Sequence, residues 1–451
     1  MHLQLLTVLI PLALAQFITS VSANEPKSQV KKGTVTMTVS LNNQNLLMPG
    51  KGRVHLAVDL KATNKAPNKR LPMNLALVID RSGSMRGEKI EKTREAARHL
   101  IKQLSDKDRI AIVSYSDHVR VDLPSQLATE EIKKQALDAI SRIHAGGSTN
   151  LSGGLFRGQS EVQKSMASGQ INRVIVMSDG LANRGIVDTK ALAQHTQKSA
   201  QRGVSVSTMG VGTDYNEDLM TAVADHGSGN YYFIKESSAI AAVFSQELKK
   251  MFSTVAQNAS VELLLDDGVD LKQVFGYTFR REGEKVIIPL AELFAGQKRS
   301  ILIELQVPVL RVGNVAVGQA KFRYNDVIAN GKETLAEANL NVNVTKDKTL
   351  VERTRNRSVE ERIGEVEVAS AMNTAANLVK EGRFGEAKNV IRRQRSMTMS
   401  QSRAMGGSKR LKKQAKELDE LEALFDKAKA APASAPAAIK ATKSKGYRLK
   451  K

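Results

Sequence analysis

The sequence predicts an α/β protein in which a doubly wound, mostly parallel sheet is inserted in an antiparallel β-sandwich and followed by a helical region. Between about residues 72 and 251, apolar runs alternate with amphipathic helical patterns. This alternation is typical of a parallel sheet covered by helices on both faces. Strands that alternate apolar and polar residues stand on both sides of this segment, as in sheets with one wet face. Beyond residue 346 the apolar spacing becomes helical.

Composition sets limits on the class of protein. The chain has 451 residues and a formal net charge of +22, and from Val351 onward 24 basic residues face 12 acidic ones. A basic surplus is typical of proteins that meet nucleic acid, anionic lipid or acidic partners. With only 4% aromatic residues and no stacking pattern among them, a solvated helical surface is favoured over a nucleic-acid interface. The absence of cysteine excludes disulfides and thiolate metal sites.

The N-terminus resembles an export signal. A short apolar run, Leu3 to Ala15, is followed by the small-residue sequence Val21-Ser22-Ala23. We therefore expect residues 1–23 to be cleaved and the protein to be exported, either to the periplasm or as a secreted protein. No later apolar stretch has the length of a membrane span, so no transmembrane segment is expected in the mature chain.

The β-sandwich is expected from two separate stretches, residues 24–70 and residues 253–346. In the first, Val35, Met37 and Val39 alternate with threonines, and a second alternating strand follows from Val54 to Leu60. The second stretch contains three such strands, near residues 301–307, 316–324 and 338–344. Because neither set can bury its apolar face alone, we predict that they pair with each other across the inserted domain.

The inserted α/β domain is predicted to span residues 71–252. Its first strand, Leu75–Ile79, is an unbroken apolar run typical of a strand buried on both faces. Further strands are predicted at 109–115, 119–123, 174–177, 204–211 and 231–234. Helices are predicted near 89–104, 130–143, 189–201, 217–225 and 238–251, with another after residue 150.

Residues 347–430 are predicted to be helical. Ser358 and Glu361 fit a capping box that opens a helix, and Glu381-Gly382-Arg383 ends it. A second helix is expected over 384–395, and Leu418, Leu421 and Phe425 mark a third. Residues 431–451, rich in Ala, Pro and Lys, are predicted to be a disordered basic tail able to contact anionic surfaces.

Chemistry-bearing residues gather where strands end. Asp80, Ser82 and Ser84 follow the first strand of the α/β domain directly. Thr149 lies in the Gly-Gly-Ser-Thr-Asn loop before a helix, and Asp179 follows the strand near 174–177. Since the carboxyl ends of parallel strands share one edge of the sheet, these five side chains should meet there. Hydroxyl and carboxylate oxygens suit a hard divalent cation.

These motifs resemble those of the von Willebrand factor type A (VWA) domain with a complete metal-ion-dependent adhesion site. The Asp-x-Ser-x-Ser pattern at Asp80, Ser82 and Ser84, then Thr149, then Asp179, matches at all five positions. The later strands, with the Met-Gly-Val-Gly-Thr-Asp segment at residues 209–214, look like a bacterial branch. That branch is similar to inter-alpha-trypsin inhibitor heavy chains and calcium-activated chloride channel regulators.

The resemblance implies a six-stranded sheet and a site in which the three hydroxyls bind Mg²⁺ directly, with Mn²⁺ or Ca²⁺ as alternatives. The two aspartates then act largely through water. The cation completes its octahedron with an Asp or Glu carboxylate from a partner protein, so the implied function is metal-dependent protein binding without catalysis. The partner is expected to contact the rim of the site near Met85, Asn150 and Gly180.

A metal-assisted enzyme or a transport-regulating component is the alternative function. It would need a general base near the metal, and His144 is the one candidate in the sequence, whereas a solvated histidine is the simpler interpretation. No Gly-x-Ser-x-Gly elbow surrounds Ser82 or Ser84, and no zinc-hydrolase or phosphate-loop motif occurs, so no nucleotide is expected. Regulation of a cytoplasmic ATPase through the same site conflicts with the signal-like N-terminus.

Overall fold

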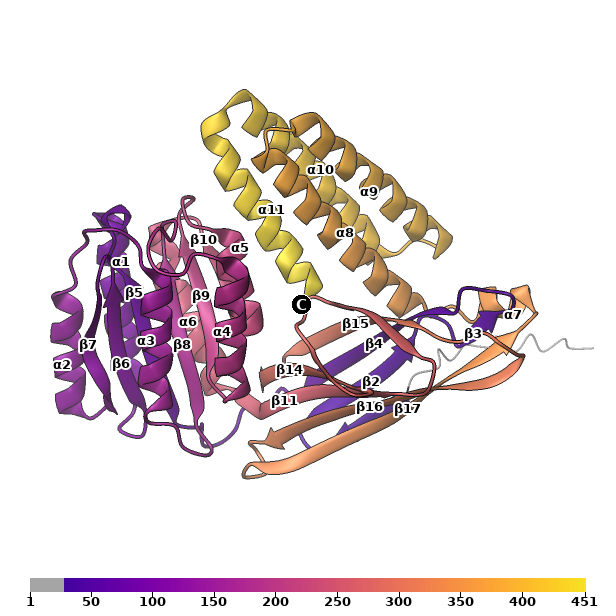
Figure 1. Cartoon of the computed structure of the whole chain (residues 1–451), viewed down its shortest axis with the longest axis horizontal. Helices are drawn as coiled ribbons and strands as arrows, with labels where there is room; N and C mark the ends of the chain where they lie inside the picture. Colours follow the sequence, from indigo (N-terminus) through magenta and orange to yellow (C-terminus); the bar gives the residue numbers. More distant parts are fainter. Residues whose placement is uncertain (1–27) are drawn as a thin grey trace, which may run out of the picture.

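A computed structural model describes residues 28–451, which form three β-sheets and a set of C-terminal helices (Figure 1). The predicted signal, residues 1–23, lies outside the described residues. Across the described part of the chain, no helix combines the length and the apolar character needed to cross a membrane.

The α/β domain is built on a six-stranded sheet in the order β10-β9-β8-β5-β6-β7. Neighbouring strands are parallel except β7, which runs antiparallel to β6. The strands are β5 (Met73–Asp80), β6 (Arg109–Tyr115), β7 (Val119–Leu127), β8 (Ile171–Ser178), β9 (Ser205–Val211) and β10 (Ser228–Ile234). The prediction of a mostly parallel, doubly wound sheet is confirmed.

Helices cover both faces of this sheet because β5 is apolar on both sides. Leu75 and Leu77 pack in one core cluster, whereas Ala76 and Val78 pack in another. The first face is covered by α1 (Glu88–Gln103), α2 (Glu130–Ser141) and α6 (Ile240–Phe252). The second is covered by α3 (Leu151–Gln163), α4 (Thr189–Gln201) and α5 (Glu217–His226). Four of these helices begin at a side-chain N-cap, namely Thr129, Asn150, Asp188 and Asn216.

The β-sandwich combines strands from before and after the α/β domain. Its first sheet has the order β1-β2-β4-β15-β12 and its second the order β13-β14-β11-β16-β17-β3. The strands before the insertion are β1 (Ser28–Lys32), β2 (Val35–Leu41), β3 (Asn45–Leu47) and β4 (Arg53–Ala62). Those after it are β11 (Thr254–Leu265), β12 (Asp270–Phe275), β13 (Arg280–Glu282), β14 (Lys285–Phe294), β15 (Lys298–Gln306), β16 (Gly313–Asp326) and β17 (Lys332–Thr345). Because β4 pairs with β15 and β3 with β17, the predicted insertion is confirmed.

Five helices follow the sandwich: α7 (Lys348–Arg353), α8 (Arg357–Lys380), α9 (Phe384–Ala404), α10 (Lys409–Ala430) and α11 (Ala435–Lys450). The expected capping box at Ser358 is wrong, since the N-cap of α8 is Asn356, whose side chain accepts hydrogen bonds from the amides of Ser358 and Val359. The second helix continues past the predicted end at residue 395. The predicted break at Gly382 and the buried stripe of α10, with Leu418, Leu421 and Phe425, are present.

The expected disordered tail is wrong. Residues 435–450 form α11, which runs from the helical region to the junction of the sandwich and the α/β domain (Figure 1). Lys440 and Lys443 are only 3% and 8% exposed, and both contact Glu217 of α5, at 2.7 and 3.1 Å. These buried ion pairs explain why the C-terminal segment is ordered as a helix. Because Lys440 and Lys443 are used in these pairs, they are not available to bind an anionic surface outside the molecule.

Candidate metal centre

Asp80 lies at the carboxyl end of β5, where the strand leaves the sheet. Its side chain is fully buried, and both of its oxygens accept hydrogen bonds, from the Ser82 amide at 2.8 Å and the Ser178 hydroxyl at 2.7 Å. Burial raises the pKa of Asp80 to about 6, although these hydrogen bonds act in the opposite direction. The Asp80 carboxylate therefore shapes the loop that follows it, and a nearby cation would favour its charged form.

The two serines of the loop after β5 contact each other and a second acid. Ser82 Oγ lies 3.1 Å from Ser84 Oγ, and the Ser84 hydroxyl donates to Asp179 Oδ1 at 2.7 Å. Asp179 follows β8 and its side chain has no exposed surface, whereas Ser84 is exposed. Two neighbouring strands thus bring their polar ends together, as the predicted sheet requires.

Thr149 is held beside this loop by backbone hydrogen bonds. The Gly83 amide donates to the Gly147 carbonyl at 2.9 Å, and the Gly146 amide donates to the Arg81 carbonyl at 2.7 Å. These bonds join the loop before α3 to the loop after β5 and fix the position of Thr149 at the same edge.

Gly180 shows that the three hydroxyls surround one point. A Cβ atom built on Gly180 would lie 3.0 Å from Ser84 Oγ, 3.4 Å from Thr149 Oγ1 and 3.9 Å from Ser82 Oγ. Three hydroxyl oxygens face a common space here, and two carboxylates stand behind them. This donor set fits a Mg²⁺ ion, which prefers oxygen ligands and keeps several waters. The structure brings all five predicted residues to one edge, and their role as metal ligands stays a prediction.

Within residues 28–451, no group of three or more His, Asp or Glu side chains is arranged to hold a metal ion. The space beside Gly180 is surrounded by three hydroxyl oxygens, so a cation there would contact neutral ligands. Neutral ligands leave much of its charge uncompensated, which favours an additional anionic ligand from outside the chain.

Two further residues belong to this cluster. Ser178 is the buried donor to Asp80, and its place next to Asp179 was the only signal for it in the sequence. Lys89, on the first turn of α1, places its Nζ 2.5 Å from Asp179 Oδ2 and 3.4 Å from the Ser84 carbonyl. No pattern in the sequence links Lys89 to Asp179, because the contact depends on how α1 packs against the sheet.

The expected partner-facing rim needs correction. Met85 has no exposed surface and packs in the core with the α1 side of the sheet, so it is not available to a partner. Gly180 is buried against the hydroxyls, and Asn150 uses its side-chain oxygen to cap α3 through the Gly153 amide. Exposed residues beside the site include Ser84, Gly147 and the loop that follows Gly180, which begins with Leu181.

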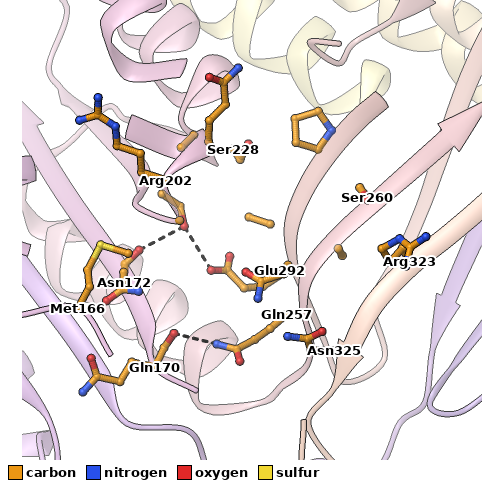
Figure 2. Close-up of a pocket in the computed structure, with 18 of the residues that line it drawn as sticks. Met166, Gln170, Asn172, Arg202, Ser228, Gln257, Ser260, Glu292, Arg323 and Asn325 are labelled. Carbon is orange, nitrogen blue, oxygen red and sulfur yellow. Dashed lines mark hydrogen bonds between the residues drawn. The ribbon is translucent and has the colours of Figure 1, made fainter. Parts of the chain in front are cut away.

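A cavity of about 830 Å³ lies between the α/β domain and the sandwich, and none of the five predicted ligands lines it. Figure 2 shows Glu292 and Gln257 on its sandwich side, facing Asn172 and Gln170 of the α/β domain. Glu292 pairs with Arg173 at 2.6 Å, and Gln257 donates to the Gln170 carbonyl at 2.9 Å. These side chains hold the two parts together.

His144, the one candidate general base, is exposed and makes no hydrogen bond to the five site residues within the described chain. Its position thus gives no support to an acid–base mechanism at the metal centre.

Comparison with known proteins agrees with this geometry. Residues 74–246 match the family model of the von Willebrand factor type A domain. Over 213 residues the chain is 35% identical to YfbK of Escherichia coli, a match that covers 47% of this chain and 37% of YfbK. It is 27% identical over 307 residues to sll0103 of Synechocystis, covering 65% of this chain and 71% of sll0103. Mouse inter-alpha-trypsin inhibitor heavy chain 4 is 29% identical over 171 residues, which are 37% of this chain and 18% of that protein.

Solved structures extend the likeness beyond the α/β domain. A von Willebrand factor type A protein from Catenulispora acidiphila superposes with a TM-score of 0.67 at 20% identity, covering 82% of this chain and 89% of that chain. The ArnB paralog VWA2 of Sulfolobus acidocaldarius gives 0.60 at 18% identity, covering 92% and 99%. At these identities the likeness concerns the fold. Together with the family match, it identifies residues 74–246 as a VWA domain.

Proposed function

We propose that this protein is an exported binding protein that docks an acidic residue of a partner protein on a Mg²⁺ ion held by Asp80, Ser82, Ser84, Thr149 and Asp179. The observation that carries the proposal is the convergence of three hydroxyls on one point beside Gly180, with both carboxylates hydrogen-bonded behind them. VWA domains commonly bind divalent metal at this position and commonly mediate protein–protein interaction.

The physical reason lies in the charge of the donor set. Ser82, Ser84 and Thr149 supply neutral oxygens, and Lys89 neutralises part of the charge on Asp179. A divalent cation bound here keeps a net positive field at the exposed side of the site. A carboxylate from another protein can replace a water in that shell, and the attraction is strong because Ser82, Thr149 and the two aspartates are buried.

The export part of the proposal depends on the N-terminal sequence. The apolar run Leu3 to Ala15 and the small residues before Asn24 have the pattern of a cleaved signal. Detection of a mature chain that begins near Asn24 in the periplasm or medium would support it.

Asp80→Asn and Ser84→Ala test the metal centre. We expect both variants to lose Mg²⁺ binding at least about tenfold in calorimetric titrations, because each removes a ligand or the charge behind one. Asp80→Asn preserves the shape of a buried side chain, and Ser84 is exposed, so both variants should melt close to wild type in chelator.

Asp106→Ala is the matched control, since Asp106 is exposed and lies in the turn before β6, away from the strand ends that form the site. Unchanged Mg²⁺ affinity in both site variants would contradict the proposed ligand set.

A further inference from the structure

The loop after Asp179 exposes apolar side chains beside the metal centre. Leu181, Ile186 and Val187 are 60%, 44% and 49% exposed. They are three of the eleven large hydrophobic side chains that are exposed within residues 28–451, and they fall within seven consecutive residues. We call these three residues the apolar rim. Exposed apolar groups gathered in one place mark interaction sites more often than single exposed ones do.

The apolar rim is fixed to the site by hydrogen bonds. The Thr149 amide donates to Asn183 Oδ1 at 2.9 Å, and the Asn183 amide donates to the Thr149 carbonyl at 3.1 Å. Farther along, the Ile186 amide donates to the Ser152 hydroxyl at 2.8 Å. Leu181 itself is bonded to Gly180, whose Cβ position lies among the three hydroxyls. The loop therefore presents its apolar side chains from a backbone tied to a predicted ligand.

The charged side chain of Arg184 in this loop is paired with an acidic residue of a neighbouring loop. Arg184 pairs with Asp117 at 3.0 Å, and Ser148 and Arg184 lower the pKa of Asp117. The Arg184–Asp117 pair joins the loop to the chain after β6 and leaves the aliphatic side chains as the exposed part.

We propose that the partner segment carries an acidic residue flanked by a bulky aliphatic or aromatic residue, which packs on Leu181, Ile186 and Val187 while the carboxylate binds the metal. This inference rests on the proposed function. Apolar contact around a charged contact excludes water from it, and the residues that dominate an interface are usually surrounded by contacts that exclude water. Burial of two or three aliphatic side chains supplies affinity that a single exposed carboxylate–metal contact lacks.

Peptide selection tests the inference even while the natural partner is unidentified. A phage library of random heptapeptides is panned on the full chain in Mg²⁺, and bound phage are released with EDTA. We expect the released sequences to be enriched in an acidic residue with Leu, Ile, Val or Phe within two positions. The most enriched peptide, synthesised with a fluorescein label, is then titrated by anisotropy.

The triple variant Leu181→Ser/Ile186→Ser/Val187→Ser is expected to weaken this peptide at least about tenfold and to leave Mg²⁺ affinity within about twofold of wild type. Leu310→Ser is the matched control, because Leu310 is 82% exposed in the β15–β16 connection, and it should bind like wild type.

The outcomes separate the two proposals. Released acidic peptides without an apolar neighbour, or equal peptide affinity in the triple variant, would overturn the apolar rim and leave metal-dependent docking in place. Peptide binding that survives both EDTA and Asp80→Asn would overturn the proposed function. If no peptide is released by EDTA, both proposals fail.

Discussion

At the scale of single residues, Lys89 makes a contact that no sequence pattern predicts. Its ammonium group lies 2.5 Å from Asp179 Oδ2, and the carboxylate is buried while the lysine side chain is 27% exposed. Lys89 thus supplies a positive charge next to the point that the three hydroxyls surround. A divalent cation bound there must compete with this charge for Asp179.

Replacing Lys89 by Met should therefore strengthen divalent-metal binding. At a separation of about 4 Å the repulsion between a lysine and a divalent cation amounts to roughly 2–8 kcal/mol, so we expect Mg²⁺ affinity to rise about tenfold or more in calorimetric titrations. In chelator the variant should melt at lower temperature, because Asp179 loses its counter-charge.

Lys92→Met is the control for this change, since Lys92 lies on the same helix but pairs with Glu95 on the surface. Unchanged or weaker Mg²⁺ binding in Lys89→Met would show that Lys89 does not compete with the metal.

At the scale of elements, the sequence predicted best where one segment determines its own environment. The predicted strand at β5 and the predicted helix over residues 189–201 are both present in the structure. Burial on both faces of a strand and the amphipathicity of a helix can be recognised from consecutive residues. The five predicted site residues lie at one edge of the sheet for the same reason, since each follows a strand or precedes a helix, and their role as ligands stays a prediction.

Elements that depend on distant partners were missed. The short strands β12 and β13 are mostly exposed and have no clear alternation. The composition of α11 resembles a disordered tail, yet Lys440 is buried on Glu217, which lies 223 positions earlier in the chain. Lys89 was missed likewise, because its partner Asp179 lies 90 positions away.

The contact of α11 with α5 predicts a pH dependence. Burial opposes ionisation of Glu217, but Lys440 and Lys443 outweigh it and lower the pKa of Glu217 to about 2 from 4.5. Since the folded pKa lies below the unfolded one, this stabilisation is complete above about pH 4.5 and is lost as the pH falls toward 2.

We expect Glu217→Gln to lower the apparent free energy of unfolding in urea by roughly 2 kcal/mol at pH 7, because it removes the charge that pairs with Lys440 and Lys443. The difference from wild type should shrink as the pH falls below about 4.5. Glu236→Gln is the control, since Glu236 is 70% exposed in its pair with Lys235. A difference that is constant with pH would contradict a charge-based contact.

At the scale of the whole molecule, α11 contacts all three parts. Its Tyr447 ring packs edge-on against Tyr231 of β10 at 5.6 Å between centroids. The carbonyl of Leu449 accepts a hydrogen bond from Arg362 of α8 at 2.6 Å, and the Lys451 carbonyl, just past its end, accepts one from Tyr277 of the sandwich at 3.1 Å. These contacts link the VWA domain, the sandwich and the helical region through one helix.

Truncation after Ala430 should therefore loosen the VWA domain without affecting its metal site. The Arg173–Glu292 pair remains, so the domain stays attached to the sandwich on its other side. We expect amide hydrogen exchange in α5 and β10 to accelerate at least about tenfold, because α11 packs on these two elements. Exchange in α1 and β5, which α11 does not cover, should stay as slow as in the full chain.

Magnesium affinity of the truncated chain should equal that of the full chain within about twofold, since no residue of α11 contacts the five site residues in the described structure. Uniform acceleration of exchange across the VWA domain would instead mean that α11 is part of the stability of the whole domain.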